Sequence, residues 1–243
     1  MKTYISRREK NTQLIVFYSA WGTDEKMLTP LCNDDVDFIL FYNYSADEAL
    51  ILPEMKKYER VILIAWSLGV WAAEYLFPKT GIKPDISIAV NGTPLPAHET
   101  YGIPLKIIEG TLNNITEESK SKFYLRMFGG KTTFAMNHDR VPVRTLKSLH
   151  DELRWLYNRI MEQNESAFRW DYAVISEEDR VFPSKNLRAY WGDKKETRKI
   201  SLPFPHYFFH KWNAFPEFVS FVEDFQAMSD REKKSSLKRI KDL

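Results

Sequence analysis

A serine lies between a strand pattern and a helix pattern in the first third of the chain. The pentapeptide AWSLG, centred on Ser67, follows the apolar residues 61–64 and precedes residues 70–77, where apolar side chains recur at helical spacing. Small residues two before and two after a serine are typical of a tight strand-to-helix turn that presents the hydroxyl as a nucleophile. A serine that caps the following helix is the alternative. The flanking strand and helix favour the nucleophile.

A serine nucleophile of this kind works with an acid and a histidine that follow it in the chain. Asp179 comes just after the strand-like residues 170–176, in the polar turn where such an acid belongs. Its neighbours Glu177 and Glu178 are chemically able to orient a histidine as well. We predict Asp179 as the acid, with Glu178 as the second choice.

Only two of the five histidines follow the last strand-like run, residues 197–204. His206 lies on the loop directly after that run, whereas His210 begins the C-terminal helical region. A neutral imidazole can take the serine proton and return it to the leaving group. An isolated histidine in this place would be an ordinary loop residue, but the order after Ser67 and Asp179 predicts that His206 is the general base.

The oxyanion that develops in such a reaction needs two backbone N–H donors, one from the residue after the nucleophile and one from an early loop. These donors would be Leu68 and Trp21. Trp21 lies in FYSAWGTD, residues 17–24, where small residues allow a tight backbone path and Gly22 relieves the turn. The alternative for this segment is an ordinary loop with an aromatic core residue.

Short apolar runs predict the sheet that positions these residues. Runs rich in β-branched and aromatic residues suit strands buried on both faces, which normally belong to a parallel sheet covered by helices. Residues 70–77 would form a crossover helix of such a sheet. The strand-like runs are residues 13–22, 37–44, 60–69, 85–92, 169–176 and 197–204.

The character of the chain changes between residues 96 and 166, where charges alternate with apolar residues at helical spacing. Residues 103–115 carry β-branched side chains but also fit one helix face, and we favour a helix there. The sequence therefore predicts an α/β fold with a mostly parallel central sheet, divided into a core of residues 1–95 and 167–243 and a helical insertion of residues 96–166. The C-terminus is expected to begin as an amphipathic helix and to end in a charged, solvated tail.

Composition and charge exclude several classes of protein. A net charge of +2 over 243 residues is far from the basic excess of a nucleic-acid-binding protein. No apolar run approaches the roughly 20 residues that span a bilayer. Cys32 is the only cysteine, and the first 11 residues lack the apolar core of a signal peptide, so we expect a cytoplasmic protein. No zinc-type cluster and no glycine-rich phosphate loop is present, so we expect no metal and no organic cofactor.

Taken together, the motifs resemble the α/β-hydrolase family, and more narrowly the BioG-type esterases that cleave the methyl ester of pimeloyl-acyl carrier protein in biotin synthesis. The resemblance implies a serine carboxylesterase with Ser67 as nucleophile, His206 as base, Asp179 as acid, and Trp21 and Leu68 as oxyanion donors. It extends over nearly the whole chain and rests on FYSAWGTD, AWSLGVWAA, NGTPLP, GIPLKIIEGTLNNI, KFYLRMFGG and PHYFFHKW.

In that family the insertion would be a cap that supplies an apolar channel and a basic surface for the acidic acyl carrier protein. Trp66 and Phe123 are the expected pocket residues, although either could belong to the core. Basic residues that alternate with acidic ones are equally typical of any solvated helix. The basic candidates for carrier-protein contact are Lys122, Arg126, Arg144, Lys147, Arg154 and Arg159.

Two other functions remain open at the level of sequence. An α/β-hydrolase with the same residues could act as an esterase or thioesterase on another acyl substrate. A noncatalytic module of this fold could bind an acyl chain or a protein, although the set of Ser67, Asp179 and His206 argues against it. We expect the chain to act as a monomer.

Overall fold

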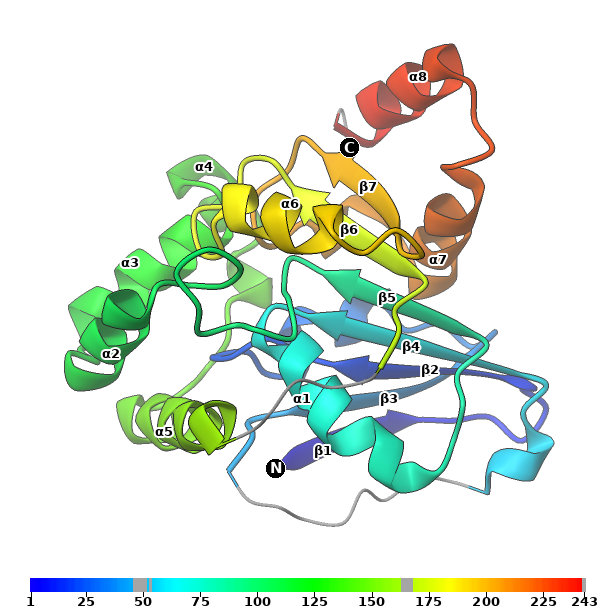
Figure 1. The fold of residues 1–243 in the computed structure, drawn as a ribbon. Coiled ribbons are helices and arrows are strands. Elements are labelled where there is room, and N and C mark those ends of the chain that lie inside the picture. Colours follow the sequence, from blue (N-terminus) through cyan, green and yellow to red (C-terminus); the bar gives the residue numbers. More distant parts are fainter. Residues whose placement is uncertain (46–51, 53, 163–167, 242–243) are drawn as a thin grey trace.

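The computed structural model describes residues 1–45, 52, 54–162 and 168–241, and a seven-stranded sheet lies at its centre (Figure 1). The strand order is β1-β3-β2-β4-β5-β6-β7. Only the edge strand β1 runs antiparallel to its neighbour, and every other pairing is parallel. The strands are β1 Lys2–Ser6, β2 Gln13–Tyr18, β3 Asp37–Tyr42, β4 Arg60–Trp66, β5 Ile86–Val90, β6 Tyr172–Ser176 and β7 Arg198–Leu202.

All six predicted strands are confirmed, and the central ones are buried on both faces of the sheet. Every residue of β3 is buried, and only the first residue of β2 and of β4 is not. The prediction missed β1, whose five residues are mostly exposed and carry no apolar run.

Helices cover both faces of the sheet. On one face α1 (Leu68–Leu76) and α6 (Ser184–Gly192) pack against the side chains of the central strands, and on the other face α7 (Phe215–Asp224) does so. Figure 1 shows α1 and α7 on opposite sides of the strands. Short 3-10 turns connect the elements at Glu25–Met27, Thr29–Leu31, Met55–Lys57, Phe77–Thr80, His138–Arg140 and Phe209–Lys211.

Four helices lie between β5 and β6, and no strand is found among the described residues of this segment. They are α2 Leu105–Asn113, α3 Glu117–Met127, α4 Lys131–Met136 and α5 Leu146–Glu162. The ambiguous segment 103–115 is therefore helical, as predicted. The expected boundary of the insertion at residues 166 and 167 lies outside the described residues. Figure 1 shows these green helices gathered at one side of the sheet, next to the ends of β4 and β5.

The charged C-terminal segment is exposed to solvent at most positions, as expected, and it forms a helix of its own. After α7 the chain turns and forms a separate helix, α8 (Asp230–Lys241), which buries Ile240. Among the described residues, no helix combines the length and the apolar character that crossing a membrane would require.

Candidate active site

The backbone of Ser67 is strained at the turn between β4 and α1. Its φ of 58° and ψ of −125° lie outside the regions that non-glycine residues normally occupy. The Ser67 N–H donates a hydrogen bond to the carbonyl of Val90 at 2.8 Å, which ties the turn to the end of β5. Such strain is found mainly where the surrounding structure holds a functional side chain in place.

Gly69 explains why small residues flank the serine. A Cβ atom at this position would lie 2.3 Å from the carbonyl oxygen of Tyr18 and 2.5 Å from that of Ser19. A Cβ at Gly92 would lie 2.2 Å from the carbonyl oxygen of Ser67. The turn therefore packs directly against two neighbouring loops of the sheet, and only glycine allows this approach.

His206 and Asp179 are in direct contact. The Nδ1 atom of His206 lies 2.6 Å from Oδ2 of Asp179, and both side chains are fully buried. The other carboxylate oxygen of Asp179 accepts hydrogen bonds from the N–H groups of Val181 at 2.7 Å and Phe182 at 2.8 Å. These donors fix the carboxylate, so Nδ1 of His206 donates to it and Nε2 remains available for other chemistry.

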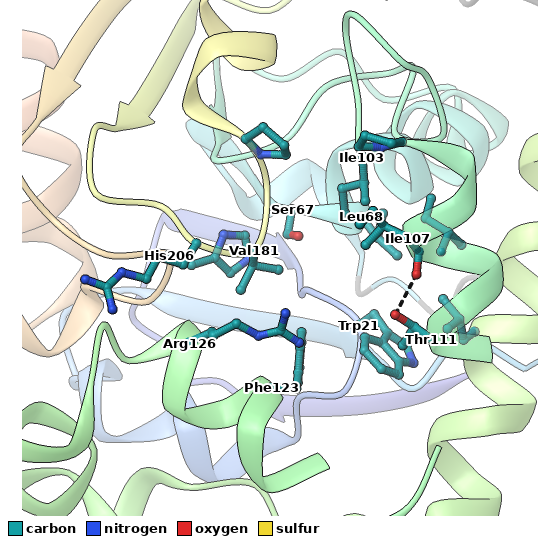
Figure 2. Close-up of a pocket in the computed structure, with 15 residues that line it drawn as sticks. Trp21, Ser67, Leu68, Ile103, Ile107, Thr111, Phe123, Arg126, Val181 and His206 are labelled. Atoms are coloured by element: carbon teal, nitrogen blue, oxygen red, sulfur yellow. Dashed lines mark hydrogen bonds between the residues drawn. The ribbon is translucent and has the colours of Figure 1, made fainter. Parts of the chain in front are cut away.

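The second ring nitrogen of His206, Nε2, is buried and has no hydrogen-bond partner among the described residues. His206 lines the same pocket as Ser67 (Figure 2). A buried nitrogen without an acceptor or donor is unusual in a folded protein and is typical of a group kept free for catalysis. Of the two alternative acids, Glu178 is exposed, and Glu177 pairs with Arg188.

The backbone of His206 is also held in place. Its carbonyl oxygen accepts hydrogen bonds from Nε1 of Trp66 at 3.1 Å and from Nδ2 of Asn91 at 3.0 Å. Asn91, which has a φ of 48°, also binds both the backbone and the hydroxyl of Ser176 at the end of β6. The motif NGTP that begins at Asn91 therefore links three strand ends around the histidine.

The prediction that Trp66 lines the pocket is wrong. Successive side chains of a strand point to opposite faces, so Trp66 lies on the α7 face of β4 with Ile62 and Ile64. Its ring is fully buried, 5.3 Å from that of His206 between centroids. Trp66 packs against His206 from the α7 side of the sheet and does not line the cavity.

The two expected oxyanion donors lie beside Ser67 in the pocket lining. The N–H of Leu68 belongs to the first turn of α1, where N–H groups have no intrahelical acceptor. The N–H of Trp21 likewise has no acceptor among the described residues. Gly22 follows Trp21 with a φ of 77°, a conformation that favours glycine.

A pocket of about 250 Å³ lies over these groups and is almost entirely apolar. Figure 2 shows Ser67, His206 and Trp21 around one space, with Ile103, Ile107 and Phe123 completing its wall. Phe123 is thus placed where it was expected, 4.7 Å from the ring of Trp21. The further lining residues are Leu68, Pro104, Ile108, Thr111, Arg126, Leu153, Arg180, Val181 and Pro183.

Arg144 does not belong to a basic surface, which corrects its expected role in carrier-protein contact. Its side chain is 5% exposed and lies 3.0 Å from the fully buried carboxylate of Glu152. The other basic candidates lie at the surface, where Lys122, Lys147 and Arg159 pair with acidic residues of their own helices, and Arg154 contacts His150. Arg126 is exposed at the pocket and pairs with no acidic residue in the described chain.

Sequence reasoning missed several residues of the site. Arg180 and Ile103 line the pocket, and Asn91 holds His206. The motif NGTP was visible after a strand, and this position was the available signal for Asn91. Within the residues that the structure describes, no group of three His, Cys, Asp or Glu side chains could hold a metal ion.

A strained serine after β4, an acid after β6 and a histidine after β7 at one edge of a mostly parallel sheet define the α/β-hydrolase fold. The chain belongs to the BioG family, described as pimeloyl-ACP methyl esterase BioG, whose model matches residues 1–217.

Known proteins similar to this chain include one that is itself named BioG. The chain is 36% identical over 182 residues to a malonyl-[acyl-carrier protein] O-methyltransferase of Bacteroides fragilis; the match covers 74% of this chain and only 36% of that relative. It is 32% identical to an uncharacterized protein of Haemophilus influenzae, over 83% of this chain and 93% of that protein. A crystal structure of BioG from Haemophilus influenzae superposes with a TM-score of 0.79 at 30% identity, covering 89% of this chain and 99% of that one.

Proposed function

We propose that this protein hydrolyses the methyl ester of pimeloyl-acyl carrier protein, with Ser67 as nucleophile, His206 as base and Asp179 as acid. Membership of the BioG family supports the substrate. The observation that carries the mechanism is the 2.6 Å contact between His206 and Asp179, together with the free Nε2 of His206 in the same pocket as Ser67.

In the first half-reaction the Oγ atom of Ser67 attacks the ester carbonyl carbon while Nε2 of His206 takes the hydroxyl proton. The N–H groups of Trp21 and Leu68 stabilise the oxyanion of the tetrahedral intermediate. The intermediate collapses when the bond between the carbonyl carbon and the methoxy oxygen breaks, and His206 gives its proton to the leaving methanol. An acyl ester on Ser67 remains.

In the second half-reaction water attacks the acyl ester and gives its proton to His206. The bond between the acyl carbon and the Ser67 oxygen then breaks, and His206 returns the proton to that oxygen. The carboxylate of Asp179 stabilises the charged imidazole in both halves and keeps its tautomer fixed. The products are methanol and the free pimeloyl acid on its carrier.

The substrate class fits the apolar wall of the pocket. An acyl chain can lie against Ile103, Ile107 and Phe123, which come from the helical insertion between β5 and β6. We assign residues 96–166 as a cap over the site on this basis. The remaining candidates for contact with an acidic acyl carrier protein are the exposed Lys122, Arg126, Lys147 and Arg154 and the partly exposed Arg159.

The experiment compares two methyl esters of pimelate, one attached to acyl carrier protein and one free monomethyl pimelate. We expect the carrier-linked ester to have the higher kcat/KM, because only it can use the basic surface for encounter. Equal kcat/KM values for the two esters would show that the enzyme does not recognise the carrier protein, which would contradict that part of the proposed function. In parallel, a fluorophosphonate probe should label the wild type and fail to label Ser67→Ala.

A further inference from the structure

The loop after β2 is held by the helical insertion as well as by the sheet. The indole N–H of Trp21 donates to the carbonyl of Leu149 in α5 at 2.9 Å. The carbonyl of Gly22 accepts a hydrogen bond from the hydroxyl of Tyr124 in α3 at 2.8 Å. The loop that carries one expected oxyanion donor is therefore attached to two helices that lie about 100 residues or more further along the chain.

A buried ion pair completes this attachment. One carboxylate oxygen of Glu152 accepts from the N–H of Gly22 and the other from the N–H of Tyr44, both at 3.1 Å. Arg144 lies 3.0 Å from the same carboxylate and donates to the carbonyl of Thr23 at 2.5 Å. A second nitrogen of Arg144 donates to Oδ1 of Asn43 at 2.6 Å, so both oxygens of Glu152 and two nitrogens of Arg144 contact the loops that follow β2 and β3.

Burying such a pair costs desolvation free energy. Burial raises the pKa of Glu152, while Arg144 and the two N–H donors oppose that rise. Two charges removed from water contribute little net stability compared with apolar residues of the same size, so stability alone gives weak reason for the pair. Its contacts with Gly22 and Thr23 point to a role in holding the loop.

We propose that Glu152, supported by Arg144, is a positioning residue for the oxyanion hole; this inference rests on the proposed function. Glu152 binds the N–H of Gly22 while Tyr124 binds its carbonyl, so the peptide groups on both sides of Gly22 are fixed. The indole of Trp21 is fixed by Leu149. The N–H of Trp21 belongs to the preceding peptide group, whose carbonyl, that of Ala20, accepts a hydrogen bond from the Thr23 hydroxyl at 2.8 Å. The backbone on both sides of Trp21, a residue that lines the pocket with Ser67, is therefore held by hydrogen bonds.

The test is Glu152→Gln, with Asp151→Asn as the matched control. The substituted glutamine keeps the shape of the side chain, but its NH₂ group cannot accept one of the two backbone hydrogen bonds. Asp151 is the neighbouring carboxylate on α5, and it pairs with Lys147 at the surface. The substrate is a short p-nitrophenyl ester, so the result does not depend on whether the carrier-linked ester is the natural substrate.

We expect Glu152→Gln to lower kcat about 10- to 100-fold with KM nearly unchanged, since oxyanion contacts act mainly in the transition state. A trifluoromethyl ketone, which forms a tetrahedral adduct, should lose affinity by a similar factor, whereas binding of a product carboxylic acid should not change. Asp151→Asn should match the wild type. A loss confined to KM, an equal loss of product binding, or full activity in Glu152→Gln would overturn the proposal.

Tyr124→Phe keeps the proposal testable if Glu152→Gln does not fold. This variant removes only the hydrogen bond to the carbonyl of Gly22. We expect a smaller fall in kcat, about 3- to 10-fold, again with KM unchanged and with weaker binding of the trifluoromethyl ketone. Unchanged kcat and unchanged ketone affinity in Tyr124→Phe would count against positioning of the loop by the insertion.

Discussion

Asp179 binds His206 through one carboxylate oxygen and is itself bound through the other. The contact with Nδ1 of His206 is 2.6 Å, and the N–H groups of Val181 and Phe182 hold the second oxygen at 2.7 and 2.8 Å. Glu178, one residue earlier, is exposed. The turn after β6 therefore presents one of two adjacent acids to the histidine and the other to solvent.

Asp179→Asn should lower kcat by about 10³- to 10⁴-fold, because an amide can hold His206 in the wrong tautomer and cannot stabilise its charged form. Glu178→Gln should retain wild-type activity, since its side chain is exposed. Steady-state kinetics on a p-nitrophenyl ester measures both variants. If Glu178→Gln were the more damaging change, the acid would be misassigned.

Gly69→Ala should destabilise the fold by about 3 kcal/mol or more, because its Cβ would overlap the carbonyl oxygens of Tyr18 and Ser19. Gly110→Ala is the matched control, since a Cβ in that part of α2 meets no atom within 4 Å. It should stabilise the helix by about 0.5–1 kcal/mol. Urea denaturation measures both, and equal stabilities would show that the turn is less tightly packed than described.

Charge reversal on the exposed surface of the insertion should affect carrier-linked substrates selectively. Lys122→Glu combined with Arg154→Glu, at two exposed positions that do not line the pocket, should raise KM for the carrier-linked ester about tenfold and leave KM for a p-nitrophenyl ester unchanged. Lys83→Glu, at an exposed position just before β5, is the control. An equal rise in KM for both substrates would indicate damage to the pocket and not to a docking surface.

His210 should make stability depend on pH. Burial, with smaller effects from Lys211 and Arg140, lowers its pKa to about 4 from an ordinary value of 6.5. Between these two values the unfolded chain binds a proton that the folded chain does not. The contribution of His210 to the free energy of unfolding is therefore complete above pH 6.5 and is lost as the pH falls toward 4.

His210→Gln should therefore lose less stability than the wild type between a pH of about 7 and about 4.5, as measured by urea denaturation. His138→Gln, at an exposed position, should keep the wild-type pH dependence. If both variants showed the same pH dependence of the free energy of unfolding as the wild type, the pKa of His210 would not be lowered in the folded protein.

The strands, the turn at Ser67 and the order of the acid and the histidine follow from local patterns. Apolar runs long enough to bury both faces identify the central strands, and the turn residues follow each strand end. β1 was missed because an edge strand with one exposed face carries no such run.

Burial of charged residues could not be predicted from helical spacing. Arg144 and Glu152 look like the alternating charges of a solvated helix, but their partners Gly22, Thr23 and Tyr44 lie more than 100 residues earlier in the chain. Trp66 was misplaced for a related reason. Its neighbour Ser67 faces the pocket, but the pleat of β4 directs Trp66 to the opposite side.

The most direct test of the account is hydrolysis of pimeloyl-acyl carrier protein methyl ester, read as a gel mobility shift, by the wild type and by Ser67→Ala side by side. We expect the wild type to convert the ester to the free acid and a folded Ser67→Ala variant to convert none. Equal conversion by both proteins would contradict the role of Ser67. Absence of conversion by a wild type that still cleaves short p-nitrophenyl esters would leave a serine hydrolase and contradict the proposed substrate.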